Sequence, residues 1–129
     1  MIRLLVNGRP RMKLAPGQIV DTALILLNEV GIDELTTRRL AARLGVRQPA
    51  LYWHFRNKQA LIVAMNATML ERNHTHRQPR PGESWDDFMR EFSYRFRRGL
   101  LDFRDGARVH AGTDPSDGDL PGAEAQLRC

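Results

Sequence analysis

The 129-residue sequence has one cysteine, Cys129, and this residue is the last of the chain. An internal disulfide bond is therefore excluded, and we expect the reducing cytoplasm to be the compartment. The apolar runs ALILL and LIVAM are too short to cross a membrane, so we expect no membrane partner. The first residues also lack the extended apolar stretch that is typical of a signal peptide.

Acidic residues are missing from one long stretch of the chain, between Glu34 and Glu71. Residues 1–80 carry 13 Lys and Arg against 5 Asp and Glu, whereas residues 81–129 carry 7 against 10. A surface with charge of one sign attracts a polyanion, which predicts nucleic acid as a partner. A basic face that is merely solvated is the alternative. The cations of the acid-free stretch are Arg38, Arg39, Arg43, Arg47, Arg56 and Lys58.

Segments with the alternating pattern of a strand are also missing, and the apolar periodicity predicts an all-α protein. Pro16 suits a first helical turn, and Gly31 and Gly45 suit positions just past helix ends. Ser84 with Asp87 resembles a capping box. We expect helices over residues 16–30, 36–44, 49–55, 58–72 and 85–103, a short helix in RDGARVHAG and the beginning of another in AEAQLRC.

The stretch RQPALYWHFRNK, residues 47–58, combines three aromatic rings with basic ends. It follows a short helix and a glycine turn, which is the arrangement of a helix-turn-helix, whose second helix enters the major groove of DNA. Leu51 and Phe55 are four residues apart and can face the core. The outer face then holds Gln48, Ala50, Tyr52, Trp53 and His54. The alternative is that Tyr52 and Trp53 pad a small core.

The residue types on this face match known contacts with DNA. Gln48 can pair with adenine through two hydrogen bonds, and Ala50 can contact a thymine methyl group. Arg38 can likewise pair with guanine through two hydrogen bonds. Lys58 stands at a predicted helix N-terminus, where backbone amides hold phosphates. We therefore expect double-stranded DNA as the partner.

The stretch LNEVGIDELTTRRLAARLGVRQPALYWHFRNKQAL resembles the DNA-binding domain of the TetR family, and in particular of its tetracycline repressors. The likeness continues through NHTH, ESWDDF, FRDGARVHAGT and AQLR, so it covers nearly everything from Met12 onward. It implies a three-helix DNA-binding domain at residues 12–57, after an extension at 1–11. Residues 58–129 would form the N-terminal part of a helical effector-binding and dimerisation domain.

The resemblance also implies a function. Such repressors are homodimers that bind a palindromic operator of a tetracycline resistance or efflux gene, and a tetracycline–magnesium complex releases them. No intrinsic cofactor is implied, because Mg²⁺ arrives with the drug. By matching positions, the DNA surface would comprise Thr37, Arg38, Gln48, Pro49, Ala50, Tyr52, Trp53, His54 and Lys58. The drug pocket would comprise His74, Phe96, His110, Thr113, Pro115 and Gln126, with His110 as the single protein ligand of the metal.

Two positions depart from the family pattern. Phe92 stands where the family has an asparagine that bonds the drug, and Asp114 stands where it has an arginine. Losing an amide that pairs with buried polar groups costs about 1–3 kcal/mol. A different polycyclic effector is therefore a second interpretation.

Two further alternatives concern other functions. His74 and His76 could belong to a hydrolytic metal site, although neighbouring Cys or carboxylate ligands are missing. Family members also continue beyond residue 129, so the resemblance implies a shortened relative or a fragment. Such a chain could be non-functional, or could pair with a full-length repressor and inactivate it.

Overall fold

The computed structural model describes residues 14–73 and 78–113, and all the secondary structure in these ranges is helical. The prediction of an all-α protein is confirmed. The residues of the expected AEAQLRC helix lie outside the described ranges, as do the extension at 1–11 and the pair His74 and His76. The helices are α1 (Pro16–Val30), α2 (Thr37–Leu44), α3 (Gln48–Tyr52), α4 (Lys58–Asn73), α5 (Trp85–Leu101) and α6 (Gly106–Ala111).

Local hydrogen bonds explain where several helices begin and end. The Thr36 side chain accepts from the Arg39 amide at 3.1 Å, and Ser84 accepts from the Asp87 amide at 3.2 Å. Asn57 caps α4 by accepting from the Ala60 amide at 2.9 Å. These side chains satisfy N–H groups that have no partner in the first helical turn.

Two predicted helices end earlier than expected. α3 ends at Tyr52, not Phe55, because the amides of His54 and Phe55 both donate to the Leu51 carbonyl, at 3.0 and 2.9 Å, and close a turn there. α5 ends at Leu101 because the chain turns sharply into α6. A Cβ atom at Gly106 would lie only 2.1 Å from the Leu100 carbonyl oxygen, so this close approach requires glycine.

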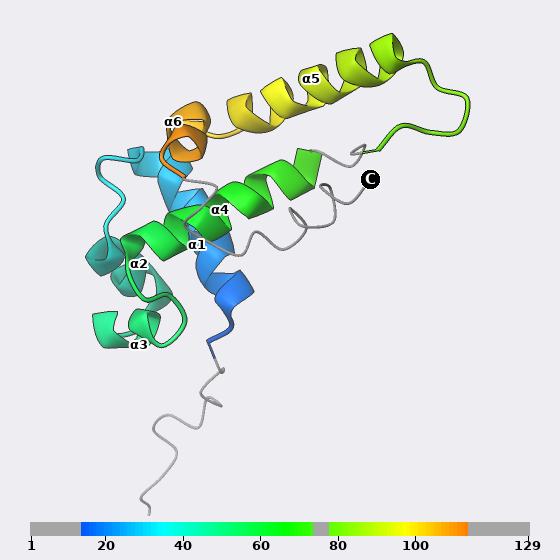
Figure 1. Cartoon of the computed structure of the whole chain (residues 1–129). Coiled ribbons are helices and arrows are strands. Elements are labelled where there is room, and N and C mark those ends of the chain that lie inside the picture. The colour runs from blue at the N-terminus through cyan, green and yellow to red at the C-terminus, as the bar shows by residue number, and fades with distance from the viewer. Residues whose placement is uncertain (1–13, 74–77, 114–129) are drawn as a thin grey trace, which may run out of the picture.

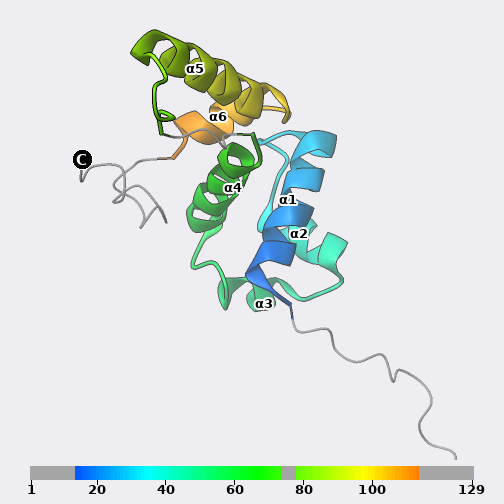
Figure 2. The same cartoon turned by 90° about the vertical axis from the view of Figure 1, so that its right-hand side faces the viewer.

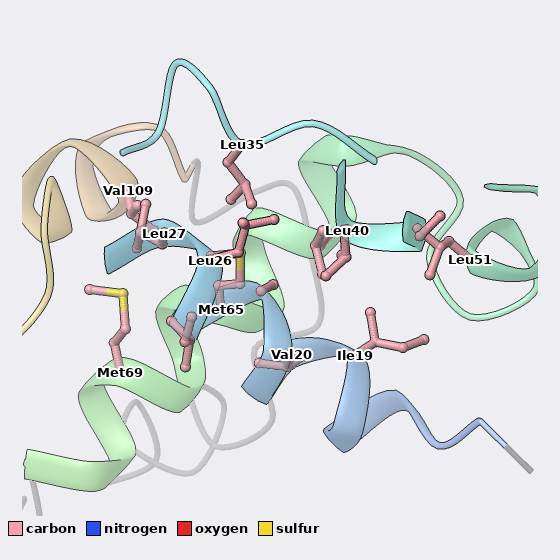
Figure 3. Packing of buried hydrophobic residues seen from close by; sticks show 14 residues of the cluster. Ile19, Val20, Leu26, Leu27, Leu35, Leu40, Leu51, Met65, Met69 and Val109 are labelled. Carbon is pink, nitrogen blue, oxygen red and sulfur yellow. The ribbon is translucent and has the colours of Figure 1, made fainter. Parts of the chain in front are cut away.

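One hydrophobic core joins the helices. Ile19, Leu24 and Leu27 from α1 are at most 1% exposed, and Met65 and Met69 from α4 are fully buried in the same cluster. Figure 3 shows Met69 near Leu27 and Val109. The cluster also includes Leu61 of α4 and Val109 of α6. The core is therefore continuous across residue 57, where the sequence analysis placed a domain boundary.

The helices are arranged so that α3 and α5 lie at opposite ends of the molecule. α4 lies beside α1, α5 packs along α4, and α6 lies between α5 and the C-terminal end of α1 (Figure 1). In both views α3 is at the end of the molecule opposite α5 (Figures 1 and 2). Within the described residues, no helix is both long enough and apolar enough to span a bilayer.

Candidate nucleic-acid interface and effector site

The short helix α3 is anchored on one side and exposed on the other. Leu51 is 3% exposed and belongs to the hydrophobic core, and Phe55 packs against the same core. Tyr52 is 48% exposed and Trp53 is 88% exposed. The aromatic rings therefore do not pad the core, and the alternative raised for them is wrong. A nearly bare indole at a surface is costly in water, which favours a partner that covers it.

Hydrogen bonds fix Gln48 at the junction of α2 and α3. Its Nε2 donates to Thr37 Oγ1 at 2.6 Å and to the Tyr52 hydroxyl at 3.3 Å. Gln48 and Thr37 are half-buried, and the bond between them ties the start of α2 to α3. Pairing with adenine requires one amide N–H, so it would replace the longer bond, to Tyr52.

The other residues expected to contact DNA lie around α3. Pro49 and His54 are exposed on α3 and just after it, and Ala50 is half-buried. Arg38 is exposed in the first turn of α2, and Lys58 begins α4. The structure thus brings all nine predicted positions to α3, its two flanking turns and the adjoining ends of α2 and α4. Their contacts with DNA remain predictions.

The cations of the acid-free stretch fall into two groups. Arg39 is paired with Glu34 at 2.8 Å, and Arg43 is paired with Glu29 through both carboxylate oxygens. The hydrogen bond from Arg43 lowers the pKa of Glu29. These two arginines therefore already have carboxylate partners within the protein.

The second group consists of exposed arginines next to α3. In residues 14–73 and 78–113, no carboxylate lies within ion-pair distance of Arg38, Arg47 or Arg56. Arg47 immediately precedes α3 and Arg56 lies in the turn that follows it. Sequence analysis counted Arg47 and Arg56 as basic residues but gave them no role, because only the structure shows which cations remain without a carboxylate. Unpaired guanidinium groups around an exposed helix suit a phosphate backbone.

A second cluster contains three residues of the expected drug pocket. The Phe96 ring meets the His110 imidazole edge-on, with centroids 5.1 Å apart. The Thr113 hydroxyl donates to the His110 carbonyl at 2.7 Å. Asn66 of α4 connects them: its Oδ1 lies 3.0 Å from His110 Nδ1, and its Nδ2 donates to Thr113 at 3.2 Å. Sequence analysis missed Asn66, because a lone amide on an apolar helix carries no distinguishing signal.

The remaining residues of the expected pocket are in the parts of the chain that the structure does not describe. His74, Asp114, Pro115 and Gln126 lie outside the described residues. Phe92 is half-buried on α5, with its ring 5.8 Å from that of Phe88. Across the described ranges, no group of three or more His, Cys, Asp and Glu side chains could hold a metal ion. A metal at His110 would therefore need most of its ligands from another source.

Two family models match most of the chain. The model for bacterial regulatory proteins of the tetR family matches residues 19–65, and the model for the tetracyclin repressor-like C-terminal domain matches residues 78–129. The chain belongs to the TetR family. The resemblance on which the sequence analysis relied is therefore confirmed.

Comparison with individual proteins gives the same result. The class A tetracycline repressor protein from transposon 1721 of Escherichia coli is 56% identical over 116 residues, which cover 90% of this chain and 54% of that protein. A structure of class A TetR with 5a,6-anhydrotetracycline and magnesium has a TM-score of 0.72 and 51% identity, covering 89% of this chain and 64% of that one. A structure of BioQ with its double-stranded DNA operator has a TM-score of 0.74 and 34% identity, covering 87% and 64%. This chain spans about half the length of the curated relatives it matches.

In this TetR-family chain, the turn that leads into α6 is tied to the end of α1 and the loop after it by a set of polar contacts. The Arg104 amide donates to Asn28 Oδ1 at 2.9 Å, and the Arg104 guanidinium donates to the Glu29 carbonyl at 2.9 Å. Asp105 Oδ2 accepts from the Ile32 amide at 3.0 Å. Gly31 has a φ of 80°, and a Cβ there would lie 2.8 Å from Asp105 Oδ2, so glycine is required.

A bidentate ion pair completes this connection. Arg108 donates from Nη1 and Nη2 to the two carboxylate oxygens of Asp33, at 2.9 and 2.8 Å. The hydrogen bond from Arg108 lowers the pKa of Asp33, and the nearby charge of Lys58 acts in the same direction. The helix that carries His110 is therefore fastened to the loop that leads into α2.

Proposed function

We propose that this chain is a TetR-type transcriptional repressor that binds a palindromic operator in double-stranded DNA as a homodimer. The gene it controls is one for tetracycline resistance or efflux, and the protein is a cytoplasmic regulator, not an enzyme. The names of its relatives support this role, since the class A protein is a tetracycline repressor. A two-fold symmetric dimer would read half-sites about 34–36 Å apart.

The observation that carries the proposal is the outer face of α3. Its aromatic rings are exposed, its anchor Leu51 is buried, and the arginines beside it have no carboxylate partner in the described part of the chain. A helix in this setting can lie in the major groove with its polar tips at base edges and phosphates. The family relationship adds that a relative, BioQ, has been solved with its operator.

The proposed effector is a tetracycline with Mg²⁺. His110 would hold the metal through imidazole nitrogen, while Phe96 and Thr113 lie beside it. The protein would supply only one ligand to the metal, His110. Mg²⁺ prefers oxygen ligands, and the drug and water would supply these. The bound metal would supply a positive charge that links the drug to the imidazole.

The contacts between α6 and the α1–α2 loop offer a route from the effector to DNA. A shift of His110 would displace Arg108, Asp105 and Arg104, whose partners lie in residues 28–33. Those partners lie at the end of α1 and in the loop that leads to α2, so the position of α2 and α3 would change. Release of DNA would follow from this displacement, since the groove contacts require a fixed helix position.

A DNA-binding titration tests the proposal. Purified chain is titrated into a fluorescently labelled duplex that carries the tetracycline operator of a class A relative, and then Mg²⁺ and tetracycline are added. We expect saturable binding that is tighter than to a scrambled duplex, and release when both additives are present. Equal affinity for both duplexes would contradict the repressor role.

Two tryptophan variants provide a matched control for the surface. Trp53 on the proposed DNA face and Trp85 at the start of α5 are both exposed, at 88% and 66%. Trp53→Ala should weaken operator binding, whereas Trp85→Ala should leave it unchanged. Loss of binding in both variants would show that the effect is not specific to α3.

A different polycyclic effector is the second candidate, and Phe92 favours it. Its ring continues an apolar row with Phe88 on α5, at the position where the resemblance implies an asparagine that bonds the drug. A ring cannot replace a hydrogen-bonding amide, so a less polar polycycle would fit better. Phe92→Asn should then increase the response to tetracycline. An unchanged or smaller response would argue against this candidate.

A further inference from the structure

Asn66 stands out because it is polar and buried. It is 4% exposed, and it is the one polar residue in the described ranges whose whole side chain is buried. A buried amide must use its hydrogen-bonding groups, because leaving them unpaired costs stability. Asn66 lies on α4, between the apolar residues Met65 and Met69 of the core, so apolar packing does not require an amide here.

The hydrogen-bond chain fixes which way the amide points. The His110 carbonyl can only accept, so the Thr113 hydroxyl must give it its single proton across 2.7 Å. Thr113 Oγ1 is then an acceptor for Asn66, and the group that faces it at 3.2 Å is the amide nitrogen. The amide oxygen consequently faces His110 Nδ1 at 3.0 Å.

This orientation determines the tautomer of His110. An amide oxygen only accepts, so Nδ1 must carry the hydrogen, and a neutral imidazole then has its lone pair on Nε2. The edge-on contact with Phe96 holds the ring from another side. A histidine prepared in this way presents one nitrogen to a metal while the other is held by the protein.

We infer that Asn66 is a positioning residue that holds His110 in the Nδ1–H tautomer, so that Nε2 is ready to bind the metal of a metal-bound effector. The inference rests on the proposed function for the identity of the effector. The assignment of the tautomer rests only on the contacts among Asn66, His110 and Thr113. Asn66 acts through His110 and need not touch the effector.

Nuclear magnetic resonance reads the tautomer directly. Protein labelled with ¹⁵N-histidine is recorded with long-range ¹H–¹⁵N correlation at a pH where the imidazole is neutral, and His110→Asn assigns the signals. We expect His110 to show a protonated Nδ1 and an unprotonated Nε2. Asn66→Ala should lose this preference, while Asn66→Asp should keep it because an acceptor remains. Wild-type protein with the hydrogen on Nε2 would overturn the inference, whatever the variants do.

Binding of tetracycline with Mg²⁺, followed by tetracycline fluorescence, supplies the second readout. Loss of an orienting partner typically weakens metal binding 10–100-fold, and we expect a loss of about this size for Asn66→Ala. Asn66→Asp keeps the acceptor for Nδ1 but loses the donor to Thr113, so it should weaken binding less than Asn66→Ala. Asn73→Ala, the same change on the same helix, is the control and should alter neither readout. An affinity of Asn66→Ala equal to that of wild type would overturn the inference.

The two readouts also separate this inference from the proposed function. A merely structural role for Asn66 would lower the melting temperature without changing the tautomer of the folded fraction, and that result would overturn it. If wild-type protein shows the Nδ1–H tautomer and Asn66→Ala loses it, but wild type binds no tetracycline with Mg²⁺, the proposed effector fails while control of the tautomer by Asn66 is upheld.

Discussion

Arg38 and Arg39 are adjacent arginines on α2 that differ in their surroundings. Consecutive helical residues are separated by about 100°, so the two side chains leave α2 in different directions. Arg39 donates to Glu34 at 2.8 Å, whereas Arg38 has no carboxylate partner among the described residues. We therefore predict that Arg38→Ala and Arg39→Ala have unequal effects on DNA binding.

The expected magnitudes follow from the two environments. A guanidinium that pairs with guanine through two hydrogen bonds contributes about 1–3 kcal/mol of discrimination. Arg38→Ala should therefore reduce affinity about 5- to 150-fold for each half-site that the dimer contacts, and relax the preference at one base pair of each half-site. Arg39→Ala breaks an exposed ion pair worth about 0–1 kcal/mol. It should leave sequence preference unchanged.

Fluorescence anisotropy provides the assay. Each variant is titrated against the operator and against duplexes that each carry one altered base pair, all at one salt concentration because affinity depends strongly on salt. The Arg38→Ala profile should flatten at a single position. Equal losses on every duplex would refute base recognition by Arg38, and a larger effect of Arg39→Ala would refute the assignment of faces on α2.

Three further predictions concern charge, packing and pH. Arg56→Ala should weaken binding to every duplex and reduce the salt slope by about 1 for each half-site, as measured by salt titration, whereas Arg43→Ala should leave that slope nearly unchanged. Leu51→Ala should lower the free energy of unfolding by about 2–5 kcal/mol in a denaturant titration, while the change at exposed Ile25→Ala stays within about 0.5 kcal/mol. Because Arg108 lowers the pKa of Asp33, their pair stabilises the fold above about pH 4 and loses this effect as the pH falls further. The melting temperatures of wild type and Asp33→Asn should therefore differ at pH 7, and the difference should shrink as the pH falls below about 4; a difference that does not change with pH would contradict the pair's role.

The helices could be predicted because their signals are local. Pro16 and Gly31 bound α1, and Thr36 and Gly45 bound α2, as the sequence indicates. The ends of α3 and α5 were placed too late, because the local backbone geometry of the turns that follow them decides these ends. Convergence of two amides on the Leu51 carbonyl ends α3, and the close approach at Gly106 turns the chain after α5. Neither contact has a signature in the sequence.

The candidate DNA face was predictable because its residues are close together in the sequence. Its aromatic residues lie within twelve positions of one another, so a local pattern reveals them. The partners of the cations were not predictable, because Glu29 and Arg43 are on different helices and meet only in the folded chain. Asn66 and His110 are likewise 44 residues apart, and only the packing of α4 against α6 brings them together.

The central claim is that the outer face of α3 contacts DNA, and the exposure of Trp53 tests it most directly. The chain has two tryptophans, so Trp85→Phe leaves Trp53 as the only indole. Acrylamide quenching of Trp53 fluorescence is measured with and without operator duplex. An indole that is 88% exposed should be quenched strongly in the free protein and become protected in the complex. Equal quenching in a complex that anisotropy shows to be saturated would contradict the claim.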